Sequence, residues 1–309
     1  MLARIWVIAF NTYREAVRAR VLHGLFGLAI ATAAYSLIVG VFALRETLRV
    51  ISDLGAASVS LYSVVVAVVL TATSLHRELE LKTIFPILAR PISRSEYLVG
   101  KFFGTMLLLL TFIAGNVGLV LLALGAFATS DAAAPAAAAA GASLVAALIA
   151  WRVPRARTLL PIPWAAAVLG LGIWLSGGAP DDQRVLLGGA CLTLAEVTVV
   201  TGIALVFASF SSPFLTAVFS LGVFVVGRSA DTLAKLPVKV FGAAIQELGR
   251  AASHVVPNLM VYVPPRTLLT GESGQALLPY LGLAAAQAAA WSLGLLAVAS
   301  LIFRRRDFL

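Results

Sequence analysis

The chain has 309 residues, of which 61% are hydrophobic and 12% charged, and its mean hydropathy is +0.99. A soluble globular domain carries about 25% charged residues, so this composition excludes one and indicates a polytopic membrane protein built from helices. The net charge is +9, but the cations lie between apolar runs and form no single basic face, which argues against nucleic acid as a partner. Residues 1–309 are predicted to form one membrane domain.

The first 20 residues are predicted to form an amphipathic helix on the membrane surface. Apolar residues recur there at spacings of three and four, with charged residues on the other side. A frayed tail before the first span is the alternative. The predicted anchors at the membrane boundary are Trp6, Tyr13, Arg14 and Arg18, together with Lys101 further along the chain.

Eight apolar runs follow, and we interpret them as an all-α bundle of eight spans. Their residues are 22–44, 55–74, 98–127, 132–151, 159–177, 185–207, 211–227 and 276–303. About 20 residues are needed to cross a bilayer, so 211–227 is marginal. The fourth run is rich in alanine, and an interfacial position for the fourth and fifth runs would leave six spans.

The distribution of cations predicts the orientation. With the N-terminus inside, 15 of the 23 Lys and Arg residues fall in cytoplasmic segments. Five of the other eight lie in one long outer loop, 228–275, and long loops contribute little to the positive-inside rule. Both termini are therefore predicted to be cytoplasmic.

A polar segment between the second and third spans, at 75–97, is the most informative stretch of the chain. Residues 75–101 hold five cations and three carboxylates. A short helix is predicted from Arg77 to Arg90, with Glu78 and Lys82 paired one turn apart. Pro86 is expected to kink or end it, and Pro91 stops it. This element is expected to lie across the cytoplasmic mouth of two spans as a docking surface. An ordinary solvated loop is the alternative.

The outer loop 228–275 is predicted to contain a second surface helix. Phe241, Ile245, Leu248, Ala252 and Val255 follow one another at spacings of three and four. Pro257, Pro264 and Pro265 then end any helix before the last span.

Two polar residues fall inside predicted spans. Glu196 lies near the centre of 185–207, where an ionised side chain costs a few kcal/mol. It either contacts a substrate or proton in a translocation path, or holds two helices together; an intramembrane enzyme centred on it is a remote alternative. Asn116 is a second candidate for the path, although an interhelical hydrogen bond explains it better.

Sequence motifs for catalysis and for metal binding are missing. The three histidines and the single Cys191 have no metal-ligand spacing. No G-x-x-x-x-G-K-[ST] motif occurs, so the chain is not expected to hydrolyse ATP itself. No cofactor or metal is expected in this chain.

The sequence resembles the ABC type-2 permeases, and within them the branch named for copper-enzyme maturation, which includes permeases linked to gliding motility. The resemblance rests on Arg77-Glu78, Lys82-Thr83, Leu88 to Arg94, and Tyr97 to Lys101, which are similar to the first cytoplasmic loop of that family. Asn11 to Arg18, Pro257-Asn258-Leu259 and Phe303 to Phe308 are similar to shorter elements elsewhere in it. The family usually has six spans, so the hairpin 132–177 is either an insertion or misread.

The resemblance implies that the polar segment is a coupling helix, which sits in a cleft of a separate ATPase. The residues implied in coupling are Arg77, Glu78, Glu80, Lys82, Thr83, Arg90, Pro91, Ser93 and Arg94. It further implies two cytoplasmic ABC ATPase subunits that bind ATP and Mg²⁺, a second permease chain in a homodimer, and a bacterial inner membrane. Export of a substrate is the expected function. The alternative is a mechanotransmission subunit that drives a periplasmic partner without solute flux.

Overall fold

The computed structural model describes residues 2–43, 46–80, 93–129, 133–235, 246–247, 249, 256–272, 274 and 276–305. All regular structure in these residues is helical, which confirms the predicted class. The long helices are α2 (Arg20–Phe42), α3 (Thr47–Glu80), α5 (Arg94–Ala128), α6 (Ala133–Arg152), α8 (Pro180–Ala208) and α14 (Leu277–Arg305). The shorter ones are α1 (Leu2–Val17), α7 (Pro161–Leu175), α9 (Pro213–Arg228), α10 (Ala230–Ala234) and α13 (Arg266–Thr270). The short 3₁₀ helices are η1 (Pro154–Ala156) and η2 (Met260–Tyr262).

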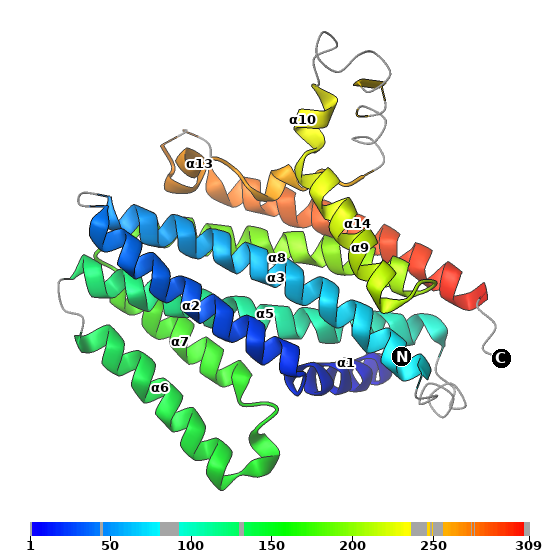
Figure 1. Ribbon diagram of the computed structural model, residues 1–309, viewed down its shortest axis with the longest axis horizontal. Coiled ribbons are helices and arrows are strands. Elements are labelled where there is room, and N and C mark those ends of the chain that lie inside the picture. Colours follow the sequence, from blue (N-terminus) through cyan, green and yellow to red (C-terminus); the bar gives the residue numbers. More distant parts are fainter. Residues whose placement is uncertain are drawn as a thin grey trace.

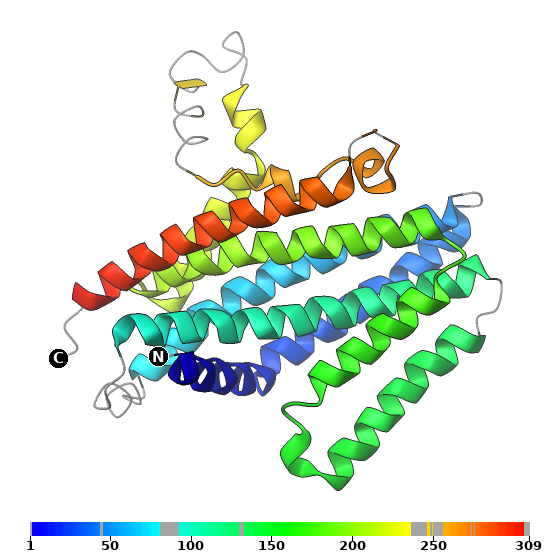
Figure 2. The same ribbon diagram turned by 180° about the vertical axis from the view of Figure 1, so that it is seen from behind.

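Helices α3, α5 and α8 run side by side through the middle of the bundle (Figures 1 and 2). Helices α2, α7, α9 and α14 pack around this centre, and α6 lies outermost, against α5 and α7. The apolar core is formed mainly by the facing sides of α3, α5 and α8. The outer sides of α2, α6 and α14 are largely exposed in the isolated chain, as expected of helices that face lipid.

Six of the described helices are long and apolar enough to cross a membrane: α2, α3, α5, α6, α8 and α14. Helices α7 and α9 have 15 and 16 residues, fewer than the about 20 needed for a full crossing. The predicted eight-span count therefore remains a prediction. The six long helices include α6, which the predicted six-span alternative would leave out.

Helix α1 confirms a helix at the N-terminus, and it packs along the beginning of α5. Two glycines of α5 make this approach close. A Cβ on Gly100 would lie 2.7 Å from Ile8, and a Cβ on Gly104 would lie 2.5 Å from the carbonyl oxygen of Ala9. Tyr13 is fully buried at this contact, so it attaches α1 to the bundle and does not sit at a lipid headgroup.

Helices α5 and α7 also approach through glycines. A Cβ on Gly118 would lie 2.6 Å from the backbone nitrogen of Leu169, and a Cβ on Gly172 would lie 2.7 Å from the carbonyl oxygen of Gly118. Small residues that let two backbones approach are the usual basis of helix packing within membranes. This contact holds α7 against the bundle despite its short length.

Helix α3 is longer than the predicted span, because it begins at Thr47 and not near residue 55. Its first turns carry Arg49 and Asp53, and these charges pair with each other, while Asp53 also pairs with Arg266 of α13. Paired charges allow the helix to continue beyond the apolar run. At its other end α3 reaches Glu80, the last residue described before the gap at 81–92.

The predicted outer loop begins with α10, which projects away from the bundle in both views (Figures 1 and 2). The chain returns through residues 256–272 and packs on the end of α9: Leu259 is fully buried, and its N–H donates to the carbonyl oxygen of Gly227 at 3.0 Å. Most of the predicted surface helix at 241–255 lies outside the described residues.

Candidate functional site

The two helices that flank the predicted coupling segment end close to α1 and α14. Ser93 caps the start of α5: its hydroxyl accepts from the N–H of Glu96 at 3.2 Å, and the Glu96 carboxylate accepts from the N–H of Ser93 at 2.9 Å. This capping box satisfies two backbone donors that the first turn leaves unpaired. Ser93, which was predicted to take part in coupling, therefore determines where α5 begins.

Arg94 joins the start of α5 to the end of α14. Its guanidinium donates to the carbonyl oxygens of Phe303 at 3.1 Å and of Arg304 at 3.0 Å. The ring of Tyr97 stacks on that of Phe303, with centroids 6.1 Å apart. A cation at the end of a helix satisfies unpaired carbonyl groups and opposes the negative end of the helix dipole. Arg94 thus connects the predicted coupling segment to the last helix.

Lys101 joins three helices at the same end. Its Nζ donates to the hydroxyl of Ser74 in α3 at 2.8 Å and lies 3.5 Å from the carboxylate of Glu15 in α1. It is buried, and its Nζ lies 5.9 Å from the ring of Tyr97. Lys101 was predicted to anchor the chain at the membrane boundary. The structure instead places it inside the bundle, where it ties α5 to α1 and α3.

The remaining predicted anchors lie on α1 or, in the case of Arg18, directly after its last residue. Trp6 is half-exposed and stacks on Phe103 with centroids 6.5 Å apart, and Arg14 and Arg18 are exposed. These three positions are compatible with the predicted contact with lipid.

The rest of the predicted coupling set lies at the end of α3 and in the segment 81–92. Arg77, Glu78 and Glu80 belong to the last turn of α3, but their side chains lie outside the described part of the structure. The same is true of the whole residues Lys82, Thr83, Arg90 and Pro91. Their role therefore stays a prediction.

Glu196 lies in the core, with 1% of its surface exposed, and forms an ion pair with Arg228. The contact is bidentate: Nε of Arg228 donates to Oε1 at 2.6 Å, and Nη2 donates to Oε2 at 2.8 Å. Ser60 of α3 completes the cluster, because its hydroxyl donates to Oε2 at 3.3 Å and accepts from Nη2 at 2.9 Å. The cluster connects α3, α8 and α9 near the middle of the bundle.

This geometry favours the structural interpretation of Glu196. A carboxylate that accepts from a two-pronged guanidinium is held in place and neutralised by it, so it does not act as an unpaired general base. Arg228 and Ser60 were not among the predicted site residues. Arg228 was assigned to the outer loop, although the turn at 209–212 lies about midway between residues 196 and 228 and so brings them to a similar depth.

Tyr262 lies beside this cluster. Its ring is buried, and its hydroxyl has no hydrogen-bond partner within the described residues. Burial, and to a smaller extent the charge of Glu196, raises the pKa of Tyr262 to about 12. The hydroxyl therefore stays protonated at neutral pH.

Asn116 is also buried, but its amide donates to the carbonyl oxygen of Phe112, in its own helix, at 2.8 Å. The side chain of Asn116 therefore forms a hydrogen bond within its own helix, and not the predicted bond to another helix. No described hydrogen bond joins Asn116 to the Glu196 cluster.

A third polar cluster, also unpredicted, lies at the other end of the bundle. Arg266 of α13 donates to the carboxylates of Asp53 and Asp182, and to the hydroxyl of Ser52 at 3.1 Å. The Ser52 hydroxyl donates to Asp182 at 2.7 Å. The cluster fixes α13 to the beginnings of α3 and α8.

These findings define a class of protein: a single helical bundle with six helices suited to crossing a membrane, tied together by polar clusters at three depths. Within the described residues, no group of three or more His, Cys, Asp or Glu side chains is placed to hold a metal ion. Comparison of the sequence with known protein families and with curated proteins found no match.

Proposed function

We propose that the chain is the membrane-spanning permease subunit of an ABC exporter, driven by separate cytoplasmic ATPases. In this proposal two copies of the chain pair in a bacterial inner membrane, with both termini cytoplasmic. Each copy binds one of two ATPase subunits through residues 75–97. ATP and Mg²⁺ bind to the ATPases, and this chain supplies no catalytic residue.

One observation carries the proposal: both helices that flank the segment 81–92 are fixed at that end to other helices. Lys101 links α5 to α1 and α3, and Arg94 links α5 to α14. A force applied to the segment would therefore move four helices together and would not merely bend a loop. Such rigidity is what a lever between an ATPase and a membrane bundle requires.

The Glu196–Arg228 pair supports a further step of the mechanism. It locks α9 to α8 and α3 in the state seen here. A buried ion pair is a discrete contact that is either made or broken, as the two states of a transport cycle require. In the proposal, closure of the ATPases shifts α3 and α5. This shift changes how Arg228 of α9 is aligned with Glu196 and Ser60.

Docking is tested by purifying the chain together with an ABC ATPase encoded beside it, from membranes that express both. In this proposal Glu78 faces a cation in the cleft of the ATPase. Reversing its charge, by Glu78→Arg, is therefore expected to weaken the complex about tenfold and to abolish stimulation of the ATPase, because two cations then repel each other at the interface. The matched control is Arg155→Glu, in the turn between α6 and α7, which should change neither property. An unchanged complex with Glu78→Arg contradicts the assignment of the segment.

Transmission is tested separately with Lys101→Met. This variant keeps the segment 75–97 intact but removes the ties to Glu15 and Ser74. It should bind the ATPase normally, while ATP-driven activity in proteoliposomes is lost. Normal ATP-driven activity in this variant would contradict the proposal that Lys101 transmits motion from the segment to the bundle.

A second function, mechanotransmission to a periplasmic partner, is favoured by the shape of the outer segment. Helix α10 projects from the bundle (Figure 1), and Asn258 holds its base by donating to Asp231 at 2.8 Å. Arg266 ties the same segment to α3 and α8. Reconstitution separates the two functions: ATPase activity that depends on a periplasmic protein, with no solute flux, would replace export by this alternative.

A further inference from the structure

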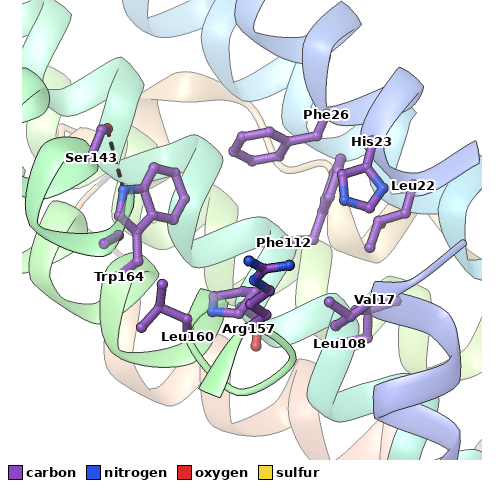
Figure 3. Close-up of a pocket in the computed structure, with 13 residues that line it drawn as sticks. Val17, Leu22, His23, Phe26, Leu108, Phe112, Ser143, Arg157, Leu160 and Trp164 are labelled. Atoms are coloured by element: carbon purple, nitrogen blue, oxygen red, sulfur yellow. Dashed lines mark hydrogen bonds between the residues drawn. The ribbon is translucent and has the colours of Figure 1, made fainter. Parts of the chain in front are cut away.

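A cavity of about 360 Å³ lies between the α6–α7 hairpin and the α1–α2–α5 side of the bundle. Figure 3 shows the side chains that line it. Its size falls within the range of about 300–1,000 Å³ that is typical of small-molecule sites. None of the polar clusters described above contributes to it.

Most of the cavity wall is apolar and aromatic. Phe26 of α2 contacts the rings of Phe112 in α5 and Trp164 in α7 edge-on, with centroids 5.9 and 5.7 Å apart. The indole N–H of Trp164 donates to the hydroxyl of Ser143 at 3.4 Å, so the outward edge of the ring is fixed against α6. A rigid aromatic wall of this kind suits an alkyl chain.

One end of the cavity is cationic. The guanidinium of Arg157 lies between Leu160 and Trp164 on one side and His23 and Phe112 on the other (Figure 3). Its Nε donates to the carbonyl oxygen of Ala150 at 2.9 Å, which fixes the side chain, and its two terminal nitrogens have no protein acceptor within the described residues. Both Arg157 and His23 are exposed, so the cavity opens at this end.

The charges around this opening have one sign. No acidic side chain lines the described cavity. Arg155 lies on the same turn as Arg157, and Arg18 and Arg20 flank the junction between α1 and α2. Cations gathered at the end of membrane helices lie at the level of lipid headgroups and attract anionic ones.

We propose that this cavity binds one anionic phospholipid from the leaflet at the α1 end of the bundle. The phosphodiester accepts from the two terminal nitrogens of Arg157, a geometry that suits a planar guanidinium. His23 faces the same headgroup, and one acyl chain lies along Phe26 and Trp164. The lipid fills the space between the α6–α7 hairpin and the bundle. This inference is independent of the proposed permease function, because it needs only a membrane.

The experiment uses the purified full chain in nanodiscs of phosphatidylcholine, with phosphatidylglycerol as the probe. Native mass spectrometry counts the lipids retained per chain, and thermal unfolding measures the stabilisation that phosphatidylglycerol produces. We expect one retained phosphatidylglycerol and a higher Tm than in phosphatidylcholine alone. Arg157→Ala should weaken retention about tenfold or more, because charge-assisted hydrogen bonds to the phosphate are lost.

Arg155→Ala is the matched control, since it removes the same charge from the same turn but does not line the cavity; it should retain the lipid. Ala146→Phe keeps every cation and fills the cavity, and it should lose the lipid while its Tm in pure phosphatidylcholine is unchanged. Equal losses in the Arg155 and Arg157 variants would show general attraction to an anionic surface and overturn the site. If inorganic phosphate raised the Tm as much as phosphatidylglycerol does, the cavity would bind the phosphate group alone, and the assignment of a lipid would be wrong.

Discussion

Replacement of Arg228 by methionine removes the partner of a carboxylate that is 1% exposed. After this change only the hydroxyl of Ser60, at 3.3 Å, donates to Glu196. Loss of one member of a buried ion pair costs about 3–5 kcal/mol. The Arg228 side chain is 27% exposed, so water screens the pair to some degree and the lower end, about 3 kcal/mol, is expected.

The double variant Glu196→Leu/Arg228→Met should recover most of this loss. Apolar residues of similar size often replace a buried ion pair at little cost, so the double variant should unfold within about 1 kcal/mol of the parent chain. The coupling energy of the cycle is then at least about 2–3 kcal/mol, because any cost of Glu196→Leu alone adds to this value. Unfolding in mixed micelles of increasing SDS content, followed by tryptophan fluorescence, measures each free energy.

The exposed pair Arg184–Asp181 is the control. Its atoms are 3.8 Å apart and both side chains are more than 60% exposed, so its coupling should stay below about 0.5 kcal/mol. An ordinary hydrogen bond between membrane helices contributes about 0.6 kcal/mol. A coupling energy for Glu196 and Arg228 at or below that value would refute the view that they lock α9 to α8.

Two further predictions concern helix packing and pH. Gly118→Ala should destabilise the chain by about 1–3 kcal/mol in the same SDS titration, because the new Cβ would meet the backbone of Leu169; Gly170→Ala, which faces open space, should be neutral or stabilising. The folded chain keeps the proton of Tyr262 up to about pH 12, whereas the unfolded chain loses it near pH 10, so this residue's contribution to stability is lost between those values. The Tyr262→Phe variant should therefore lose less stability than the parent from pH 10 to 12, by up to about 2–3 kcal/mol, and equal losses would contradict the raised pKa.

The sequence predicted the six long helices and also α7 and α9, because each of these is marked by an apolar run, whereas α10 and α13 in the outer loop were not predicted. It placed helix ends less well where charge continues along a helix. The second span was predicted to begin at residue 55, but α3 begins at Thr47. The charged Asp53 lies before the apolar run, yet it is neutralised by Arg266, which lies more than 200 residues away in the chain. A partner so distant in sequence cannot be inferred from local composition.

Of the Glu196–Arg228 pair, the sequence predicted only Glu196 as a site residue. Glu196 stands out because a carboxylate in an apolar run is rare, but its role depends on what faces it. Arg228 ends an apolar run, where a cation normally turns to water. Only the lengths of α8 and α9 show that the two residues lie at a similar depth in the bundle. Glu196 lies 12 residues before the end of α8, about 18 Å from the turn between the two helices. Arg228 lies 15 residues after the start of α9, about 22 Å from the same turn.

Helix α3 contributes to the polar clusters at all three depths. It supplies Ser52 and Asp53 at one end, Ser60 in the middle and Ser74 at the other end, and it leads directly into the segment 81–92. A displacement of that segment by an ATPase would therefore reach every cluster through one element, provided that α3 moves as a rigid rod.

Rigidity of α3 can be measured with spin labels at Arg49 and Thr73, two exposed positions on this helix. They are 24 residues apart, which corresponds to about 36 Å along a continuous helix. Addition of nucleotide to the assembled complex should leave this distance unchanged, while the distance from Thr73 to a label on the exposed Val145 of α6 changes. The second distance is the internal control, because it shows that the complex has responded. A change in the distance within α3 would mean that the helix bends and absorbs the motion, and the three clusters would then not be coupled through it.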